Sequence, residues 1–160
     1  MILKSAPVGG STGHLVGRSL LEELYREQTG EELPEIVIAP GGKPGFSRGG
    51  WHFSISHTRH WAFCALSRRS VGLDAEELSR RVSPALAEKI LSPGELAQYR
   101  AAGDKNRAML TFWVLKEARA KLSGRGLSYP LECTDFSLDD PRVFLWNGCL
   151  VAVMEEDDAV

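Results

Sequence analysis

Two carboxylates spaced two positions apart are the first feature of this sequence that could support chemistry. They are Asp74 and Glu76, in the strand-like run Val71-Gly72-Leu73-Asp74-Ala75-Glu76. Alternate side chains of a strand point to the same face, so both carboxylates would project together. Like charges this close are unfavourable unless a cation lies between them or water screens them. The pair therefore suits Mg²⁺, which binds oxygen ligands, and suits a solvated strand end equally.

A second charged group lies on a long helix predicted over residues 104–122. Trp113, Glu117 and Lys121 recur every four residues and so share one helical face. Glu117 could give a metal its third carboxylate, and the Lys121 ammonium could bind a phosphate. An ordinary exposed Glu–Lys pair fits the same spacing and would contribute only about 0.2–0.5 kcal/mol.

Two shorter segments carry further polar groups. Ser56 and His57 end a predicted strand, where the histidine could donate to a phosphate or belong to a Ser–His hydrolase. The G-x-S-x-G elbow of such hydrolases surrounds neither Ser54 nor Ser56. Lys43 and Pro44 lie in a loop rich in glycine and proline, where lysine can contact a phosphate or an adenine, or be a plain surface residue. The Walker phosphate-loop pattern is absent from the sequence.

Hydrophobic periodicity and turn signals predict the elements that carry these residues. Strands are expected over 35–39, 53–57, 61–67, 71–76, 135–138, 142–146 and 149–154, and helices over 13–28, 83–91, 104–122 and a short stretch beginning at Ser92. Asn147-Gly148 is a typical two-residue hairpin turn. This order predicts an α+β fold of two halves, residues 1–69 and 70–160, packed as one compact unit.

Composition narrows the classes of function. The chain has 160 residues and 43% hydrophobic content, which is enough for a core. A formal net charge of −2 predicts no general attraction to nucleic acid or to anionic membranes. Three widely spaced cysteines resemble neither a disulfide framework nor a zinc site, which favours a reducing compartment. With no segment of bilayer-spanning length, the sequence predicts a cytoplasmic protein.

Taken together and in order, four segments resemble the 4'-phosphopantetheinyl transferase superfamily. They are Gly42-Lys43-Pro44, the strand 53–57, the G-x-D-x-E run 71–76 and the W-x-x-K-E-A-x-x-K run 113–121, extended by residues 124–127 and 130–131. The resemblance covers about residues 13–138. Because Asp74 lies mid-chain behind a helix-containing first half, the order resembles the Sfp type, which implies a monomeric pseudo-dimer with its active site at the seam between the halves.

This resemblance implies transfer of the phosphopantetheine arm of coenzyme A to a serine of an apo acyl or peptidyl carrier protein, with adenosine 3',5'-bisphosphate as the second product. Asp74, Glu76 and Glu117 would hold Mg²⁺, and Lys121 would contact the phosphates. Glu117, or a hydroxide on the metal, would act as the base. The nucleotide end of coenzyme A would be lined by Lys43, Pro44, Ser56 and His57.

The sequence departs from the family pattern before Gly13, where the N-terminal portion is abbreviated. The basic residues that often bind the 3'-phosphate there are not evident, and Lys4, His14 and Arg18 are possible substitutes. A non-catalytic module that binds coenzyme A or a carrier protein therefore stays the alternative to the active transferase. The Ser–His hydrolase ranks third.

Overall fold

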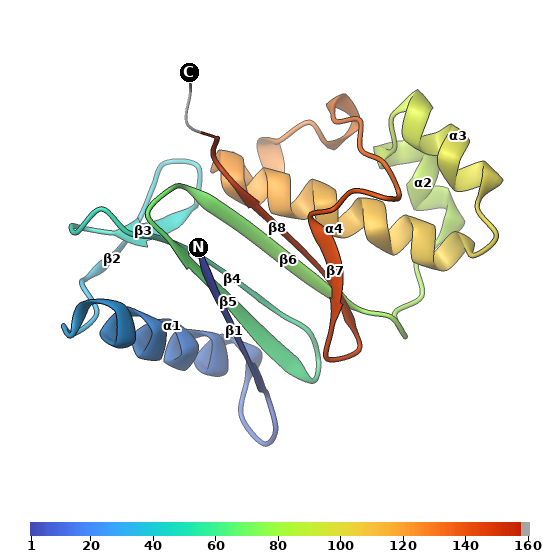
Figure 1. Cartoon of the computed structure of the whole chain (residues 1–160). Coiled ribbons are helices and arrows are strands. Elements are labelled where there is room, and N and C mark those ends of the chain that lie inside the picture. The colour runs from blue at the N-terminus through green and yellow to red at the C-terminus, as the bar shows by residue number, and fades with distance from the viewer. Residues whose placement is uncertain (158–160) are drawn as a thin grey trace.

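The computed structural model describes residues 1–157, so the end of the second predicted half, 158–160, lies outside the described residues. Two three-stranded antiparallel sheets, each covered by one long helix, make up most of the protein (Figure 1). This arrangement confirms the predicted α+β class. The relation of the two halves as a pseudo-dimer stays a prediction.

The first sheet has the strand order β1 (Ile2–Pro7), β5 (Trp61–Ser67) and β4 (His52–His57). Helix α1 (Gly13–Thr29) covers it, beginning at its N-cap Thr12 and ending at Gly30, whose φ of 73° is the left-handed conformation common at helix ends. The apolar face of α1 packs on β4 and β5, and Leu21 is completely buried there. A short hairpin, β2 (Ile36–Ile38) with β3 (Pro44–Phe46), extends from this half.

The second sheet has the order β6 (Val71–Glu77), β8 (Cys149–Glu155) and β7 (Val143–Trp146). Helix α4 (Lys105–Ser123) covers it, from the N-cap Asp104 to the C-cap Gly124. As predicted, Asn147 and Gly148 form the turn between β7 and β8, with φ values of 51° and 72°. The small helices α2 (Pro84–Ile90), α3 (Pro93–Ala101), η1 (Gly126–Ser128) and η2 (Leu131–Cys133) complete this half.

The strand β5 shows how the layers are stacked. Its side chains alternate: Ala62, Cys64 and Leu66 pack toward α1, whereas Phe63 and Ala65 pack against β6 and β8 of the other sheet. The core between the sheets is therefore shared by both halves.

The edge strands β4 and β6 of the two sheets lie side by side, and we call this junction the β4–β6 seam. Backbone ladder bonds do not join the two strands, since β4 and β6 belong to different sheets. Instead the Ser54 hydroxyl accepts a hydrogen bond from the Leu73 amide at 3.0 Å, and the Ser56 hydroxyl accepts one from the Ala75 amide at 3.2 Å. Two serine side chains of β4 thus accept hydrogen bonds from two backbone amides of β6.

Three strands differ from the sequence expectations. Pro44, expected in a loop, begins the strand β3, which pairs with β2. Strand β1 was not predicted; it pairs along its whole length with β5. The predicted strand 135–138 is wrong, because side chains of α3 take its backbone groups: Glu95 accepts from the Phe136 amide, and Gln98 bonds both the Phe136 carbonyl and the Leu138 amide. None of the described helices combines the length and the hydropathy needed to cross a membrane.

Candidate functional site

Close packing of α4 on β6 brings the two charged motifs together, and Gly72 permits it. A Cβ atom at Gly72 would lie 2.0 Å from the Ala118 carbonyl oxygen and 2.6 Å from the Leu122 amide nitrogen, both in the backbone of α4. Only a residue without a side chain lets the helix lie this close. As a result Lys121 of α4 faces Asp74, two residues along β6 from the glycine.

Asp74 is the buried centre of this group, with 7% of its surface exposed. Its Oδ1 atom accepts hydrogen bonds from Lys121 Nζ at 2.8 Å and from the Ser56 hydroxyl at 3.1 Å. Its Oδ2 atom is buried and has no hydrogen-bond partner among the described residues. Buried carboxylate oxygens nearly always have a binding partner. Oδ2 of Asp74 is therefore a candidate binding atom for a partner from outside the protein chain.

Glu76 and Glu117 flank Asp74. Burial raises the pKa of Glu76, the Arg80 guanidinium opposes that rise, and the negative charge of Asp74 adds to it. Burial likewise raises the pKa of Glu117, again with the Asp74 charge adding to the effect, while Lys121 and Arg80 oppose it. Both glutamates are therefore close enough to Asp74 to feel its charge, which is the repulsion that a bound cation would relieve.

In the present conformation, cations of the chain itself are paired with two of the three carboxylates, Asp74 and Glu76. Lys121 holds Asp74, and Arg80 is ion-paired with Glu76 while its guanidinium lies 5.4 Å from the centre of the Trp113 ring. Among residues 1–157 no three acidic, histidine or cysteine side chains are gathered into a ready coordination shell. The donor set nevertheless fits a hard divalent cation: three oxygen-bearing side chains, one with a buried free oxygen.

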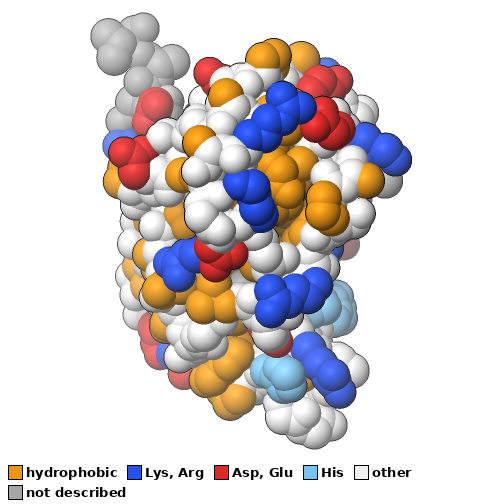
Figure 2. Space-filling model, turned by 90° about the vertical axis from the view of Figure 1, so that its right-hand side faces the viewer, with side chains coloured by type: hydrophobic (Ala, Val, Ile, Leu, Met, Phe, Trp, Pro, Cys, Tyr) orange, Lys and Arg blue, Asp and Glu red, His pale blue; other side chains and the backbone are white. Residues whose placement is uncertain are grey.

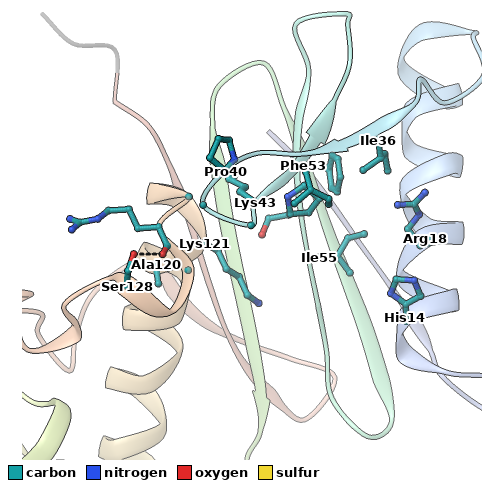
Figure 3. A pocket seen from close by; sticks show the side chains of 18 of the residues that line it. His14, Arg18, Ile36, Pro40, Lys43, Phe53, Ile55, Ala120, Lys121 and Ser128 are labelled. Atoms are coloured by element: carbon teal, nitrogen blue, oxygen red, sulfur yellow. Dashed lines mark hydrogen bonds between the residues drawn. The ribbon is translucent and has the colours of Figure 1, made fainter.

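A cavity of about 980 Å³ is lined by residues of both halves of the protein, among them Lys121, the partner of Asp74. Figure 3 shows His14 and Arg18 on α1 at one side, Lys121 and Ser128 of the second half at the other, and Phe53 and Ile55 of β4 between them. The apolar part of the lining also includes Ile36 and Ile38 of the hairpin. The cavity therefore combines an apolar wall with basic groups at its edges.

Lys43 lines this cavity but its ammonium is already engaged. Its Nζ atom donates to the Ser70 hydroxyl at 2.9 Å, to the Leu122 carbonyl at 3.0 Å and to the Val71 carbonyl at 3.2 Å. Burial lowers the pKa of Lys43, and the charge of Glu156 opposes that effect. In this conformation the lysine ties the hairpin loop of the first half to the second half.

The remaining predicted residues are divided between the cavity and the seam. Pro44 and His57 line the cavity, and α1 approaches the His57 ring closely because Gly13 has no side chain: a Cβ there would lie 2.3 Å from the ring. Ser56 is buried in the seam. Of the suggested substitutes for missing basic residues, His14 and Arg18 line the cavity, whereas Lys4 is paired with glutamates of α1.

Sequence reasoning missed several contributors to the site. The motif that contains Gly72 does not indicate its structural role. Because Gly72 has no side chain, α4 can pack closely on β6. Arg80, which the sequence motifs do not include, pairs with Glu76. The apolar cavity wall from Ile36 and Ile55 had a sequence signal, since both belong to predicted strands, but strand periodicity does not reveal which face meets a cavity.

Comparison with known proteins places this site in a family. The 4'-phosphopantetheinyl transferase superfamily model matches residues 70–146, which carry the acidic group. The chain is also 32% identical over 144 residues to the 4'-phosphopantetheinyl transferase AcpT of Salmonella typhimurium, covering 86% of this chain and 71% of that protein. The chain belongs to the 4'-phosphopantetheinyl transferase superfamily.

Other members of the superfamily match over part of their length. The transferase ffp of Bacillus subtilis is 33% identical over 135 residues, covering 82% of this chain and 59% of that protein. The transferase psf-1 of Bacillus pumilus is 30% identical over 122 residues, covering 73% and 52% respectively. The chain thus spans little more than half the length of these Bacillus members.

Proposed function

We propose that the protein transfers the 4'-phosphopantetheine arm of coenzyme A to a serine of an apo acyl or peptidyl carrier protein. The observation that carries this proposal is the free, buried Oδ2 atom of Asp74, whose other oxygen is bonded to Lys121, a residue that lines a cavity of about 980 Å³. Membership of the superfamily supports the same reaction. The proposed products are holo carrier protein and adenosine 3',5'-bisphosphate.

In this proposal Asp74, Glu76 and Glu117 hold Mg²⁺. When bound, the ion would neutralise charge on the pyrophosphate of coenzyme A. Asp74 would offer its free Oδ2, and Glu76, now paired with Arg80, would supply a second carboxylate. Burial is the main cause of the raised pKa of both glutamates, and the repulsion by Asp74 that adds to it favours the binding of a cation.

The chain's own residues would supply the remaining chemistry. The carrier serine oxygen forms a bond to the phosphorus on the pantetheine side, and the bond from that phosphorus to the leaving 5'-phosphate oxygen breaks. Glu117 accepts the serine proton, a role suited to a carboxylate whose pKa is raised by burial. Lys121 contacts the phosphates with its ammonium group and balances the charge of the leaving bisphosphate.

The cavity would hold the nucleotide end of coenzyme A. Its apolar wall, including Phe53 and Ile55, suits an adenine ring, and Pro44 and His57 lie on the same lining. His14 and Arg18 provide the basic groups for the 3'-phosphate. Lys43 contributes by fixing the hairpin loop at the cavity, through its bonds to Ser70, Val71 and Leu122.

An acidic carrier protein would meet complementary charge on this molecule. Figure 2 shows Lys and Arg side chains from top to bottom of the face at the right of Figure 1, with some Asp and Glu side chains between them and a hydrophobic area in its upper part. Opposite charge of this kind steers association and orients the partner. Since both halves line the cavity, a single chain would be sufficient for the reaction.

The deciding experiment is the intact mass of an apo carrier protein after incubation with this protein, coenzyme A and Mg²⁺. A mass gain of one phosphopantetheine that a chelator prevents would support the transferase. Binding of coenzyme A without a gain on any of several carriers would favour a non-catalytic binding module. Absence of coenzyme A binding would contradict both.

A further inference from the structure

Two serines of β4, Ser54 and Ser56, perform the same structural task at the seam. They stand two positions apart on the strand, so their side chains point the same way, toward β6. Each hydroxyl oxygen accepts a hydrogen bond from a backbone amide of β6: Ser54 from Leu73 at 3.0 Å, and Ser56 from Ala75 at 3.2 Å. Both side chains are 7% exposed. Each serine should therefore contribute about equally to joining the halves.

Ser56 makes one contact that Ser54 does not make. Its hydroxyl donates to Oδ1 of Asp74 at 3.1 Å. A serine hydroxyl has a single proton, and with the Ala75 amide on its oxygen that proton is directed at the carboxylate. Lys121 occupies the same oxygen from α4 at 2.8 Å.

The result is an asymmetric carboxylate. Oδ1 of Asp74 has two hydrogen-bond donors, one from each half of the protein, whereas the buried Oδ2 has none among the described residues. Rotation of the side chain that exchanged the two oxygens would break both bonds. The free oxygen is thereby held in a fixed direction before any ligand arrives.

We propose that Ser56 is a positioning residue for the metal site, holding Asp74 so that Oδ2 is free to bind the cation. This inference rests on the proposed metal-dependent transfer. It differs from the sequence expectation for Ser56, which is that this residue lines the nucleotide end of coenzyme A. It also gives the first half a direct role in a metal site whose carboxylates all belong to the second half.

The test is the affinity of the 160-residue chain for Mn²⁺, followed by electron paramagnetic resonance without a carrier protein, with and without coenzyme A. For Ser56→Ala we expect the dissociation constant to rise roughly 10- to 100-fold, the usual effect of losing a residue that orients a metal ligand. Ser56→Thr keeps the hydroxyl and should bind Mn²⁺ within about threefold of the wild type.

Ser54→Ala is the matched control, because it removes the equivalent seam bond without touching Asp74. Both alanine variants should lower the unfolding temperature similarly, yet only Ser56→Ala should weaken Mn²⁺ binding. Equal Mn²⁺ affinities for the two variants would overturn the positioning role while leaving the proposed function intact. Absence of Mn²⁺ binding by the wild type would overturn it together with the metal site.

Failure of the proposed function has a different signature. Wild-type protein that binds Mn²⁺ but leaves every carrier unmodified in the mass assay would contradict the transferase, not the role of Ser56. The two results are independent because metal affinity is read with no carrier present.

Discussion

The backbone carbonyl of Ala118 in α4 lies directly over Gly72 in β6, so closely that a Cβ atom on the glycine would be 2.0 Å from the carbonyl oxygen. This contact sets the distance between the strand that carries Asp74 and the helix that carries Glu117 and Lys121. The clashing atoms belong to the backbone of a long helix, which cannot shift as the end of a flexible side chain can.

Gly72→Ala should therefore destabilise the protein and weaken the site. We expect a loss of roughly 3 kcal/mol in the free energy of unfolding, measured by urea denaturation, because α4 must move away from β6. Gly45→Ala in β3 is the control, since a Cβ there meets nothing within 4 Å. Equal stability of the two variants would show that α4 is not packed as described.

Glu117→Gln tests the proposed base. Glutamine keeps the size of the side chain but cannot accept the serine proton, so we expect transfer to fall at least about 100-fold with the unfolding temperature nearly unchanged. Arg119→Gln, exposed two residues further along α4, should retain activity. Carrier loading followed by intact mass gives both rates, and undiminished transfer by Glu117→Gln would remove this residue from the mechanism.

Lys121→Met tests the contact with the phosphates. A charge-assisted hydrogen bond contributes about 1.5–3 kcal/mol, so the KM for coenzyme A should rise roughly 10- to 100-fold. Lys89→Met, on the exposed surface of α2, should leave that KM unchanged. The phosphate role would be contradicted by wild-type rates for Lys121→Met at limiting coenzyme A.

The fully buried pair of Glu95 and Lys116, whose Oε2 and Nζ atoms lie 2.7 Å apart, should be a large determinant of stability. Lys116→Met leaves the Glu95 carboxylate buried without its cation, which should cost about 3–5 kcal/mol of unfolding free energy. The double variant Lys116→Met with Glu95→Gln should cost less than the sum of the single variants, because the uncompensated charge is gone.

An exposed ion pair provides the comparison for this double-mutant experiment. Arg100 and Glu88 are 2.8 Å apart on the surface, with both side chains more than half exposed. Arg100→Ala should change the unfolding free energy by less than about 1 kcal/mol. Additive effects at Glu95 and Lys116 would mean that their contact contributes little.

Asp140 should make stability depend on pH in the acidic range. The Arg142 side chain holds the pKa of Asp140 below its usual value through hydrogen bonds of 2.9 Å and 2.6 Å, while burial opposes this effect. A carboxylate with a lowered folded pKa stabilises the fold above its unfolded pKa of about 3.9, and this contribution is lost as pH falls through the folded value.

Asp140→Asn should accordingly be less stable than the wild type by up to about 1 kcal/mol near neutral pH. The difference should shrink as the pH is lowered through the folded pKa of Asp140. Urea denaturation across that range measures it, with Asp139→Asn at the exposed neighbouring position as the control. A difference that stays constant with pH would exclude the charge of Asp140 as its cause.

Much of the local structure followed from sequence patterns. The helix beginning at Gly13, the hairpin turn at Asn147-Gly148 and the strand of Asp74 have signals contained within a few neighbouring residues, such as caps, turn residues and alternation. The strand predicted over 135–138 failed for the converse reason. Its alternation was genuine, but Glu95 and Gln98, some forty residues earlier, take its backbone groups.

The sequence by itself determined the types of residue at the site and their order, because motif spacing on a strand and a helix decides which side chains share a face. Only the tertiary structure decided their partners. Packing at Gly72 brings Lys121 to Asp74, the seam turns the Ser56 hydroxyl toward the same carboxylate, and the loop contact commits the Lys43 ammonium to the second half. The residues in these pairs are 18 to 79 positions apart in the sequence. No local sequence pattern encodes which distant acceptor a donor will bind.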